Sequence, residues 1–287
     1  MTPSRRGIRL TVAVPASLVS EYVNLRDKTE VIGRLARSAT IFRADEIVIY
    51  PEQPDESSLI KLLLGYIETP QYLRKYLYKV RPELQYVGTL KPLRTPHHQL
   101  EAHAANLRVG EFREGVLIDQ QGVDVVDIGV EKPIRFFGKS PSRGSRVTIK
   151  VIEVDPEPRC EMAKKIEIPT YWGYEIQSSK KTLGELASGG FYDLTIATSR
   201  AGTPIAAEEE HLRAKISKAR SILVAFGSPR CGIQEILRRE HREVADCFQY
   251  ILNTVPEQGT ETIRTEEAVH ATLAVLNLFA ITPMLNS

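Results

Sequence analysis

Strand-like and helix-like segments alternate at both ends of the chain, and this alternation is the strongest constraint on its fold. Residues 8–14 (IRLTVAV) are rich in β-branched residues and predict a strand, followed to about residue 42 by apolar residues at helical spacing. ADEIVIYPE (44–52) predicts a second strand. Two helical patterns come next, the second over 69–80, opened by Thr69 as cap and Pro70. This β-α-β-α order is typical of a parallel sheet.

The middle of the chain has a different pattern. From residue 86 to 171 there are short apolar runs separated by turns that contain Gly, Pro, Asp or Ser. A small barrel of about five strands fits this length, and the OB-fold is the common barrel of that size that binds oligonucleotides. An ordinary β insertion that only stabilises a dimer fits equally well. We therefore predict an α/β domain formed by residues 1–85 and 172–287, with residues 86–171 as an inserted β module.

Composition excludes several classes of protein. The chain has 287 residues, 42% of them apolar and 26% charged, as in a soluble globular protein. No apolar stretch is long enough for a signal peptide or a membrane span, so we expect a cytosolic protein. Cys160, Cys231 and Cys247 are widely spaced, with no CxxC pair and no histidines in metal-ligand register. We expect reduced thiols and no metal site.

Positive charge is clustered in two stretches. The net charge of +2 does not indicate nucleic acid by itself, but KPIRFFGKSPSRGSRVTIK (132–150) holds six cations, no acid and two phenylalanines. This run matches single-strand RNA binding, and the alternative is a solvated hairpin. RTPHH (94–98) is either an RNA contact or a plain loop; its adjacent histidines would chelate one metal poorly. The candidate RNA-binding residues are Lys91, Arg94, His97, His98, Lys132, Arg135, Lys139, Arg143 and Arg146.

The α/β pattern resumes after residue 182 and predicts three strands that each end in a polar or glycine loop. The loops are TSRAGT (198–203), GSPRCG (227–232) and NTVPEQGTETIRT (253–265), and one helix is expected between the last two strands. Loops at the carboxyl ends of parallel strands converge on one site. The GxGxxG and GxSxG motifs are absent. Ile233 and Gln234 stand where a triphosphate loop needs Lys and Ser or Thr, so the pattern favours a ligand held largely by backbone.

A resemblance to a known family rests on two of these segments. LVAFGSPRCGI, followed by NTVPEQGTETIRTEEAVHATLAVLN, resembles the two signature segments of the SPOUT class of RNA methyltransferases. Over its full length the chain is similar to the archaeal and eukaryotic SPOUT-domain family with an inserted OB-fold-like module. The resemblance implies a trefoil-knotted parallel sheet with an inserted small β-barrel, S-adenosylmethionine as cofactor, and RNA, chiefly ribosomal RNA, as substrate. It also implies a homodimer formed through the apolar terminal helix that starts near Ala268.

The resemblance also implies the residues of the site. The cofactor would lie against Thr198, Arg200, Ala201, Val224, Ala225, Phe226, Gly227, Ser228, Gly232, Asn253, Gly259, Thr260, Ile263 and Thr265. Many members of the family have a Pro-Glu-Gly-Gly loop where this chain has SPRCG. The loop therefore supplies no acidic residue, and Arg230 becomes its candidate functional side chain. Arg200 and Arg230 are the candidate catalytic residues, because a guanidinium can clamp phosphate or steady an anionic base; the alternative is a solvated loop residue. We expect Arg264 to brace the knot or to pair with a carboxylate rather than to touch the substrate.

Methyl transfer from a sulfonium is an in-line displacement that needs positioning more than chemical groups. Fixing two reactants in place can contribute on the order of 7–11 kcal/mol. No metal and no covalent nucleophile are required. Two other functions stay open at this point: a non-catalytic RNA-binding or ribosome-assembly factor that keeps the same scaffold, and a nucleotide-binding hydrolase. The sequence does not select among uridine N3, a cytosine nitrogen and a ribose 2′-oxygen as acceptor.

Overall fold

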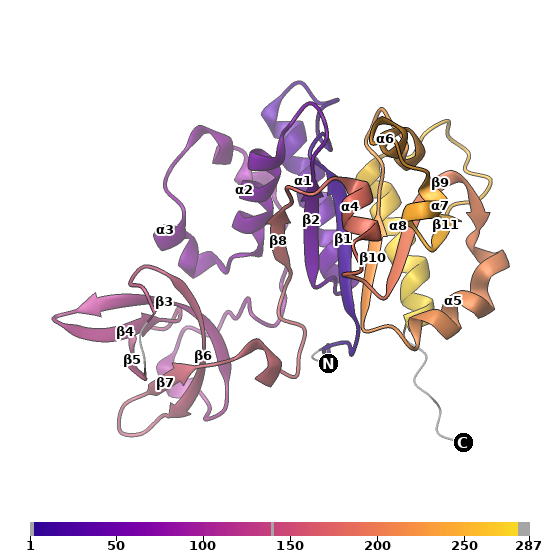
Figure 1. Ribbon diagram of the computed structural model, residues 1–287. Coiled ribbons are helices and arrows are strands. Elements are labelled where there is room, and N and C mark those ends of the chain that lie inside the picture. Colours follow the sequence, from indigo (N-terminus) through magenta and orange to yellow (C-terminus); the bar gives the residue numbers. More distant parts are fainter. Residues whose placement is uncertain (1–2, 139–140, 281–287) are drawn as a thin grey trace, which may run out of the picture. The chain divides into compact units, whose positions relative to one another are not determined.

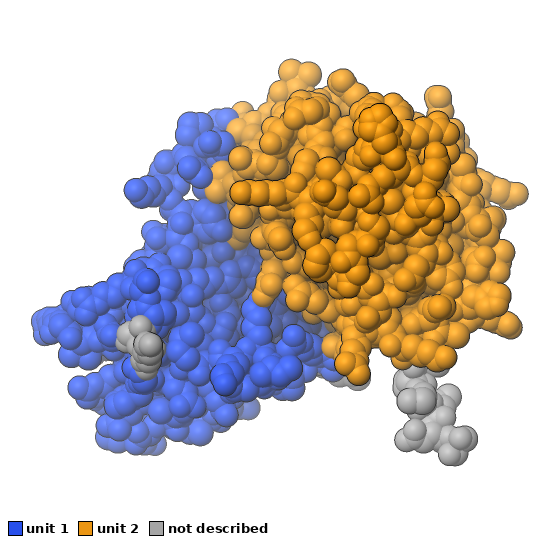
Figure 2. Space-filling view, viewed as in Figure 1, with its two compact units in different colours: residues 1–5, 66–85, 92–173 blue, residues 6–65, 86–91, 174–287 orange. Residues whose placement is uncertain are grey.

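A computed structural model describes residues 3–138 and 141–280 (Figure 1). Its internal contacts divide the chain into two compact units, coloured separately in Figure 2. Unit 1 comprises residues 1–5, 66–85 and 92–173, and unit 2 comprises residues 6–65, 86–91 and 174–287. No helix in these described ranges is long and apolar enough to cross a membrane.

Unit 2 is built on a six-stranded sheet in the order β11-β9-β10-β1-β2-β8. Every neighbouring pair is parallel, which confirms the mixed α/β fold with a parallel sheet. The strands are β1 (Arg9–Pro15), β2 (Glu46–Tyr50), β8 (Glu175–Ser178), β9 (Leu194–Pro204), β10 (Ser221–Ala225) and β11 (Tyr250–Asn253). Nearly all of β1 and all of β2 are buried, as expected when helices cover both faces of a parallel sheet.

Helices cover the two faces of this sheet according to the alternation of side chains along its strands. Ala13, Leu223 and Ala225 pack with helices α4 (Leu183–Ser188), α6 (Ile233–Arg239) and α7 (Val244–Cys247). Leu10 and Ile222 point the other way, toward α5 (Glu209–Ile216) and α8 (Thr265–Ala280). Helix α8 also packs on α1 (Leu25–Ile41), and α2 (Ser57–Glu68) follows β2 (Figure 1).

Three segments differ from the sequence prediction. Instead of one helix over 69–80 there is a single turn, α3 (Arg74–Leu77), after a 3-10 turn, and Tyr78 is already extended. The single helix expected before β11 is split into α6 and α7 because His241, with φ of 57°, lies in the left-handed region. Residues 198–203 are not a loop but the extended end of β9, where Thr203 pairs with Leu252 of β11 after a register shift.

Unit 1 contains a closed barrel of five strands in the order β3-β4-β5-β7-β6. They are β3 (Phe112–Gln120), β4 (Val123–Asp127), β5 (Ile134–Phe137), β6 (Arg146–Glu153) and β7 (Arg159–Met162). Alternate residues such as Val126, Phe136 and Ile149 fill its interior. Strands β3 and β4 approach closely at Gly115, where a Cβ would lie 2.2 Å from the Val126 side chain. Glycine is therefore required for the strands to close at this point.

A buried ionic network holds residues of unit 1 together. Arg146 donates to Glu68 at 2.5 Å and to Glu114 at 2.5 Å, and the His97 Nε2 atom lies 3.0 Å from a Glu68 carboxylate oxygen. Glu114 also accepts a hydrogen bond of 2.6 Å from the indole of Trp172. Burial alone would raise the pKa of Glu68, but Arg146 and His97 outweigh it and hold that pKa at about 2. The Glu68 carboxylate therefore stays ionised inside the unit.

His98 should make the stability of unit 1 depend on pH. Its Nε2 atom lies 2.6 Å from the Glu68 carbonyl oxygen, and burial, with His97 nearby, lowers its pKa from 6.5 to about 4. The unfolded chain therefore binds the proton first, so the free energy of unfolding should fall as pH drops from 6.5 to 4, by about 2–3 kcal/mol. Glu68 contributes fully to the free energy of unfolding above pH 4.5, and this contribution is lost only as the pH falls toward 2.

Urea denaturation between pH 4 and pH 7 tests this expectation. The fluorescence of Trp172, the single tryptophan of the chain, reports on unit 1 because its indole belongs to the network. His98→Gln keeps a donor for the Glu68 carbonyl and removes the titration, so its unfolding midpoint should change little between pH 6.5 and pH 4. Equal pH dependence in wild type and His98→Gln would contradict the assignment.

Candidate functional site

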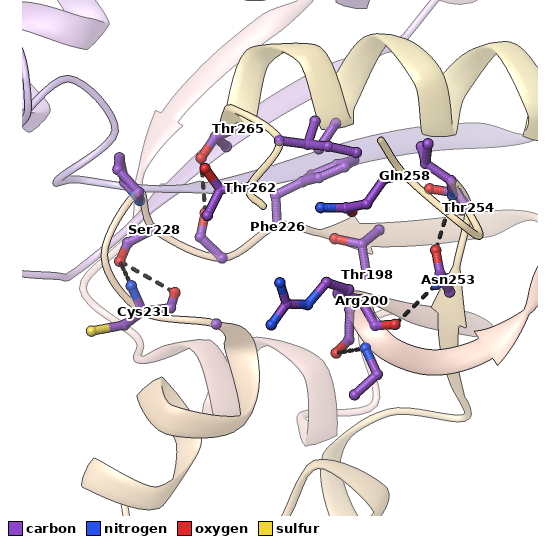
Figure 3. Close-up of a pocket in the computed structure, with 18 of the residues that line it drawn as sticks. Thr198, Arg200, Phe226, Ser228, Cys231, Asn253, Thr254, Gln258, Thr262 and Thr265 are labelled. Carbon is purple, nitrogen blue, oxygen red and sulfur yellow. Dashed lines mark hydrogen bonds between the residues drawn. The ribbon is translucent and has the colours of Figure 1, made fainter. Parts of the chain in front are cut away.

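A pocket of about 460 Å³ lies where β9, β10 and β11 reach their carboxyl ends (Figure 3). These three strands are neighbours in the sheet, so the segments that follow them meet at one edge. The lining residues are 198–201 from β9, 226–232 after β10, and 252–255, 258, 261–263, 265 and 268 from the end of β11 to the start of α8. The three segments singled out in the sequence thus line one pocket.

The loop after β10 is a tight turn that depends on Gly227. A Cβ on this residue would lie 2.9 Å from the carbonyl oxygen of Cys231, so no larger side chain fits without moving the backbone. The turn is closed by a hydrogen bond of 2.9 Å from the Ser228 amide to the Cys231 carbonyl, and the Ser228 hydroxyl accepts from the Cys231 amide at 3.0 Å. Tyr50 of β2 donates its hydroxyl to the Phe226 carbonyl at 2.6 Å. The loop is therefore fixed from inside the unit.

Side chains also connect the end of β9 to the loop before α8. Arg200 donates to the carbonyl of Glu261 at 2.7 Å, and the Asn253 amide donates to the carbonyl of Arg200 at 2.9 Å. Gln258, which Figure 3 shows among these residues, donates to the same Glu261 carbonyl at 3.1 Å. Thr265, the first residue of α8, donates to the Gly227 carbonyl at 3.2 Å. All three parts of the lining are thus tied together by side chain to backbone bonds.

The pocket has few charged groups. Only Arg200, Arg230 and Glu261 carry charge among its lining residues, which include no lysine or histidine. Arg200 is committed to a carbonyl, whereas Arg230 is exposed and makes no hydrogen bond or ion pair with any described residue. Burial raises the pKa of the Cys231 thiol, which makes it a poor nucleophile at neutral pH. The described residues also include no cluster of metal ligands.

Most residues named for the cofactor line this pocket, and four do not. Val224 and Ala225 are buried within β10, while Gly259 and Thr260 lie exposed in the loop before α8. Sequence reasoning missed Leu252, Gln258 and other lining residues of the same segments. Leu252 directly precedes the third quoted loop and the others lie inside the quoted motifs, but no sequence signal tells which residues of a loop face inward. The other lining residues that the sequence analysis did not name as cofactor ligands are Ser199, Pro229, Cys231, Thr254, Val255, Glu261, Thr262 and Ala268.

The candidate RNA-binding residues fall into different environments. His97, His98 and Arg146 are held in the buried network of unit 1 rather than on its open surface. Arg143 pairs with Asp119 at 2.7 Å and with Asp124 at 3.2 Å. Exposed candidates are Lys91, Arg94, Lys132 and Arg135, while Lys139 lies outside the described residues.

Three charged residues at the start of α8 have structural surroundings that account for them. Arg264 forms an ion pair with Glu21, which confirms the carboxylate partner expected for it. Glu267 accepts a hydrogen bond of 3.0 Å from the Arg264 amide and so caps the helix. Glu266 is 4% exposed, and burial raises its pKa. None of these three residues lines the pocket.

Comparison with known proteins agrees with this geometry. A family model described as "Putative RNA methyltransferase" matches residues 9–276. A mouse (Mus musculus) protein named 28S rRNA (uridine-N(3))-methyltransferase is 31% identical over 308 residues, covering 94% of this chain and 76% of that protein. The human protein of the same name is 30% identical over 307 residues, covering 94% of this chain and 78% of that protein.

An archaeal relative spans nearly its whole length. A protein of Halobacterium salinarum is 34% identical over 289 residues, which cover 93% of this chain and 98% of that protein. A solved structure, a probable methylase family protein from Haemophilus influenzae, aligns at a TM-score of only 0.38 with 11% identity, covering 96% of this chain and 67% of that one. Because the family model covers most of the chain and the curated relatives match it nearly end to end, the chain belongs to this family of RNA methyltransferases.

Proposed function

We propose that the protein transfers a methyl group from S-adenosylmethionine to a base nitrogen of ribosomal RNA, with uridine N3 as the acceptor. The mouse and human relatives carry that activity in their names. The observation that carries the proposal is the pocket at the carboxyl ends of β9, β10 and β11, which is lined mainly by backbone, hydroxyl and apolar groups. Parallel α/β sheets bind their ligands at this edge.

The lining residues fit this cofactor. A Cβ on Gly232 would meet no atom within 4 Å, so the pocket offers open space beside the backbone at this point. Ile233 stands where a triphosphate loop has its lysine, so that particular cation, which would repel a sulfonium, is missing. S-adenosylmethionine, when bound, supplies a methyl group activated by its positive sulfur. Thr198, Phe226–Ser228, Gly232, Asn253, Ile263 and Thr265 would hold it, with Arg200 and Ala201 at the end of β9.

The two arginines of the pocket have different roles in this proposal. Uridine N3 carries a proton that would leave to water, so negative charge builds up on the base. The nitrogen would form its bond to the methyl carbon as the bond from that carbon to sulfur breaks, and the cofactor would leave as a neutral thioether. A nearby guanidinium stabilises that charge. Arg230 is the cation of the pocket without a partner among the described residues, so we assign it this role. Arg200 is a positioning residue, because its guanidinium holds the loop at Glu261.

We extend the proposal to the architecture implied by the resemblance. Unit 2 would carry the trefoil knot of the SPOUT class, supported by the bond that fastens the start of α8 to the loop after β10. The closed five-stranded barrel supports an OB-fold-like module inserted at residues 86–171. A homodimer through α8 is supported by Leu278, which is 66% exposed on that helix; Ile281, three residues further along the predicted apolar stretch, lies outside the described residues. A cytosolic location belongs to the same proposal.

Cofactor binding is tested by calorimetry with S-adenosylmethionine. Gly232→Leu places a side chain in the open space and should weaken binding at least about tenfold, while the lost N-cap glycine costs the fold about 1 kcal/mol. Gly232→Ser is the matched control, because its short side chain caps α6 and should retain most of the affinity. Absence of binding by wild type at millimolar cofactor, or wild-type affinity in Gly232→Leu, would refute the assignment of the pocket.

The reaction is tested with ribosomal RNA from cells that lack this gene. Incubation with protein and S-adenosylmethionine, followed by mass spectrometry of the nucleosides, should show new N3-methyluridine. Arg230→Ala should lower kcat about 100-fold with little change in cofactor affinity, since a charge aimed at the transition state is lost. Arg230→Lys should recover part of kcat, and Arg200→Ala should mainly weaken cofactor binding. A different methylated nucleoside would correct the acceptor atom, and bound cofactor without any product would favour a non-catalytic assembly factor.

A further inference from the structure

A second basic and aromatic stretch lies in unit 1, outside the run at 132–150. Residues 74–81 (RKYLYKVR), here called the Lys75 segment, contain four cations and two tyrosines, and no acid occurs from Thr69 to Pro82. Only its first turn is helical, as α3, and the chain then extends from Tyr78. Lys75, Lys79 and Arg81 are exposed, and Val80 is exposed completely. The segment presents its charge and its apolar surface to solvent together.

The cations of the Lys75 segment are less neutralised than Arg143 and Arg146 of the run at 132–150. Lys79 has no hydrogen bond or ion pair in the described parts of the chain, and Arg81 lies 3.9 Å from Glu83 in an exposed pair. Lys75 lies 3.5 Å from Asp127. The Arg81 pair is exposed on both sides and therefore weak. Asp127 is largely buried, but the Lys75 side chain is 65% exposed, so both cations can still reach a phosphate. By contrast, Arg143 and Arg146 each contact two carboxylates.

Contacts within unit 1 place the start of this segment against the outside of the barrel. Tyr76 donates its hydroxyl to Asp127 of β4 at 2.6 Å, and the ring of Tyr72 fills the space beside Gly129. Val126 faces the barrel interior, so Val125 and Asp127 face outward. Arg135 of β5 lies directly opposite Val125 and therefore faces outward beside Asp127.

Phe137 continues the same outward face. It is two residues beyond Arg135 on β5, and its side chain is 40% exposed. The Tyr76 side chain is 41% exposed. Each ring has a cation beside it: Lys75 Nζ lies 4.7 Å from the Tyr76 centroid, and Arg159 Cζ lies 5.2 Å from the Phe137 centroid. Two partly exposed rings thus each lie beside a cation: Lys75 is exposed, and Arg159 also pairs with Glu153 at 3.1 Å.

We propose that Lys75, Tyr76, Lys79, Arg135 and Phe137 form a platform that binds a single-stranded segment of the RNA substrate. Unpaired bases would stack on the two rings, while the cations bind the phosphates between them. Double-stranded RNA hides its base faces and is recognised by shape and phosphate contacts, so the exposed rings favour a single strand. The platform rests on the proposed function in that the protein acts on RNA, but it requires neither the cofactor nor the reaction.

Charge is tested first, by fluorescence anisotropy with a labelled single-stranded RNA of about 16 nucleotides, the upper site size for one OB-type barrel. The cofactor is left out. For Lys75→Ala/Lys79→Ala we expect about a tenfold higher Kd at about 0.1 M salt. The slope of log K against log salt should fall by roughly 1.4, because each lost phosphate contact contributes about 0.7 for a single strand. Lys61→Ala/Lys218→Ala removes equal charge from exposed positions of unit 2 and should stay within about twofold of wild type.

Stacking is tested at Tyr76. Tyr76→Ala should raise Kd about fivefold or more, since one base on an aromatic ring is worth about 1–3 kcal/mol. Tyr76→Phe keeps the ring, loses the hydroxyl that contacts Asp127 and Lys75, and should bind nearly as wild type. Trp172 fluorescence shows whether each variant is folded. Lys79 has no partner among the described residues, so Lys79→Glu should fold and can test the platform even if another variant does not.

Several results would contradict the proposed platform. Wild-type affinity in Lys75→Ala/Lys79→Ala and Lys79→Glu would overturn the platform, and an equal loss in Tyr76→Phe and Tyr76→Ala would overturn stacking. Tighter binding to the same strand in duplex form would also reject it. Calorimetry with S-adenosylmethionine on the same variants should give wild-type affinity. If wild-type protein binds no cofactor but the RNA results hold, the proposed reaction fails and the platform stands.

Discussion

The close approach of backbone at Gly227 is the constraint on which the candidate site depends. Because no Cβ fits there, the chain can turn sharply after β10 and place Phe226 and Ser228 at the edge of the sheet. The same residue gives its carbonyl to Thr265, so the turn also fixes where α8 begins. The loop before α8 is therefore held at both ends. The side chains of Arg200 and Gln258 also hold its middle, because both donate hydrogen bonds to the Glu261 carbonyl. One tight turn thus sets the position of the whole lining.

The elements that local pattern specifies were predictable. The strands β1, β2, β9 and β10 and the helix α1 follow from runs of β-branched residues and from helical spacing. The loops after the three strands predicted beyond residue 190 could also be expected to meet at one edge of the sheet. The short helix at α3 could not be predicted, because Tyr76 and Tyr78 bond to Asp127 and to Thr69 instead of continuing a helix. Such contacts between residues far apart in sequence override local propensity.

The basic run shows the same limit for function. Six cations without an acid in the sequence look like one surface, yet Arg143 and Arg146 meet carboxylates from other strands and from α2. Glu68, at the end of α2, and Glu114, on β3, are more than 30 residues from Arg146, so no local reading of charge could pair them. The Lys75 segment has fewer cations but keeps Lys75, Lys79 and Arg81 exposed. Charge at a surface depends on which acids the fold brings near it, and that is decided by topology.

The two glycines that bracket the loop after β10 are kept glycine for different reasons. At Gly227 the backbone itself leaves no room, so any protein that folds this way must retain it. At Gly232 the dihedral angles are ones that any residue adopts, and the space beside it is open. Selection for a folded protein alone would therefore let position 232 drift while 227 stayed fixed. In a related protein that kept this fold but no longer bound the ligand, we therefore expect a larger residue to replace glycine at position 232 before any change at position 227.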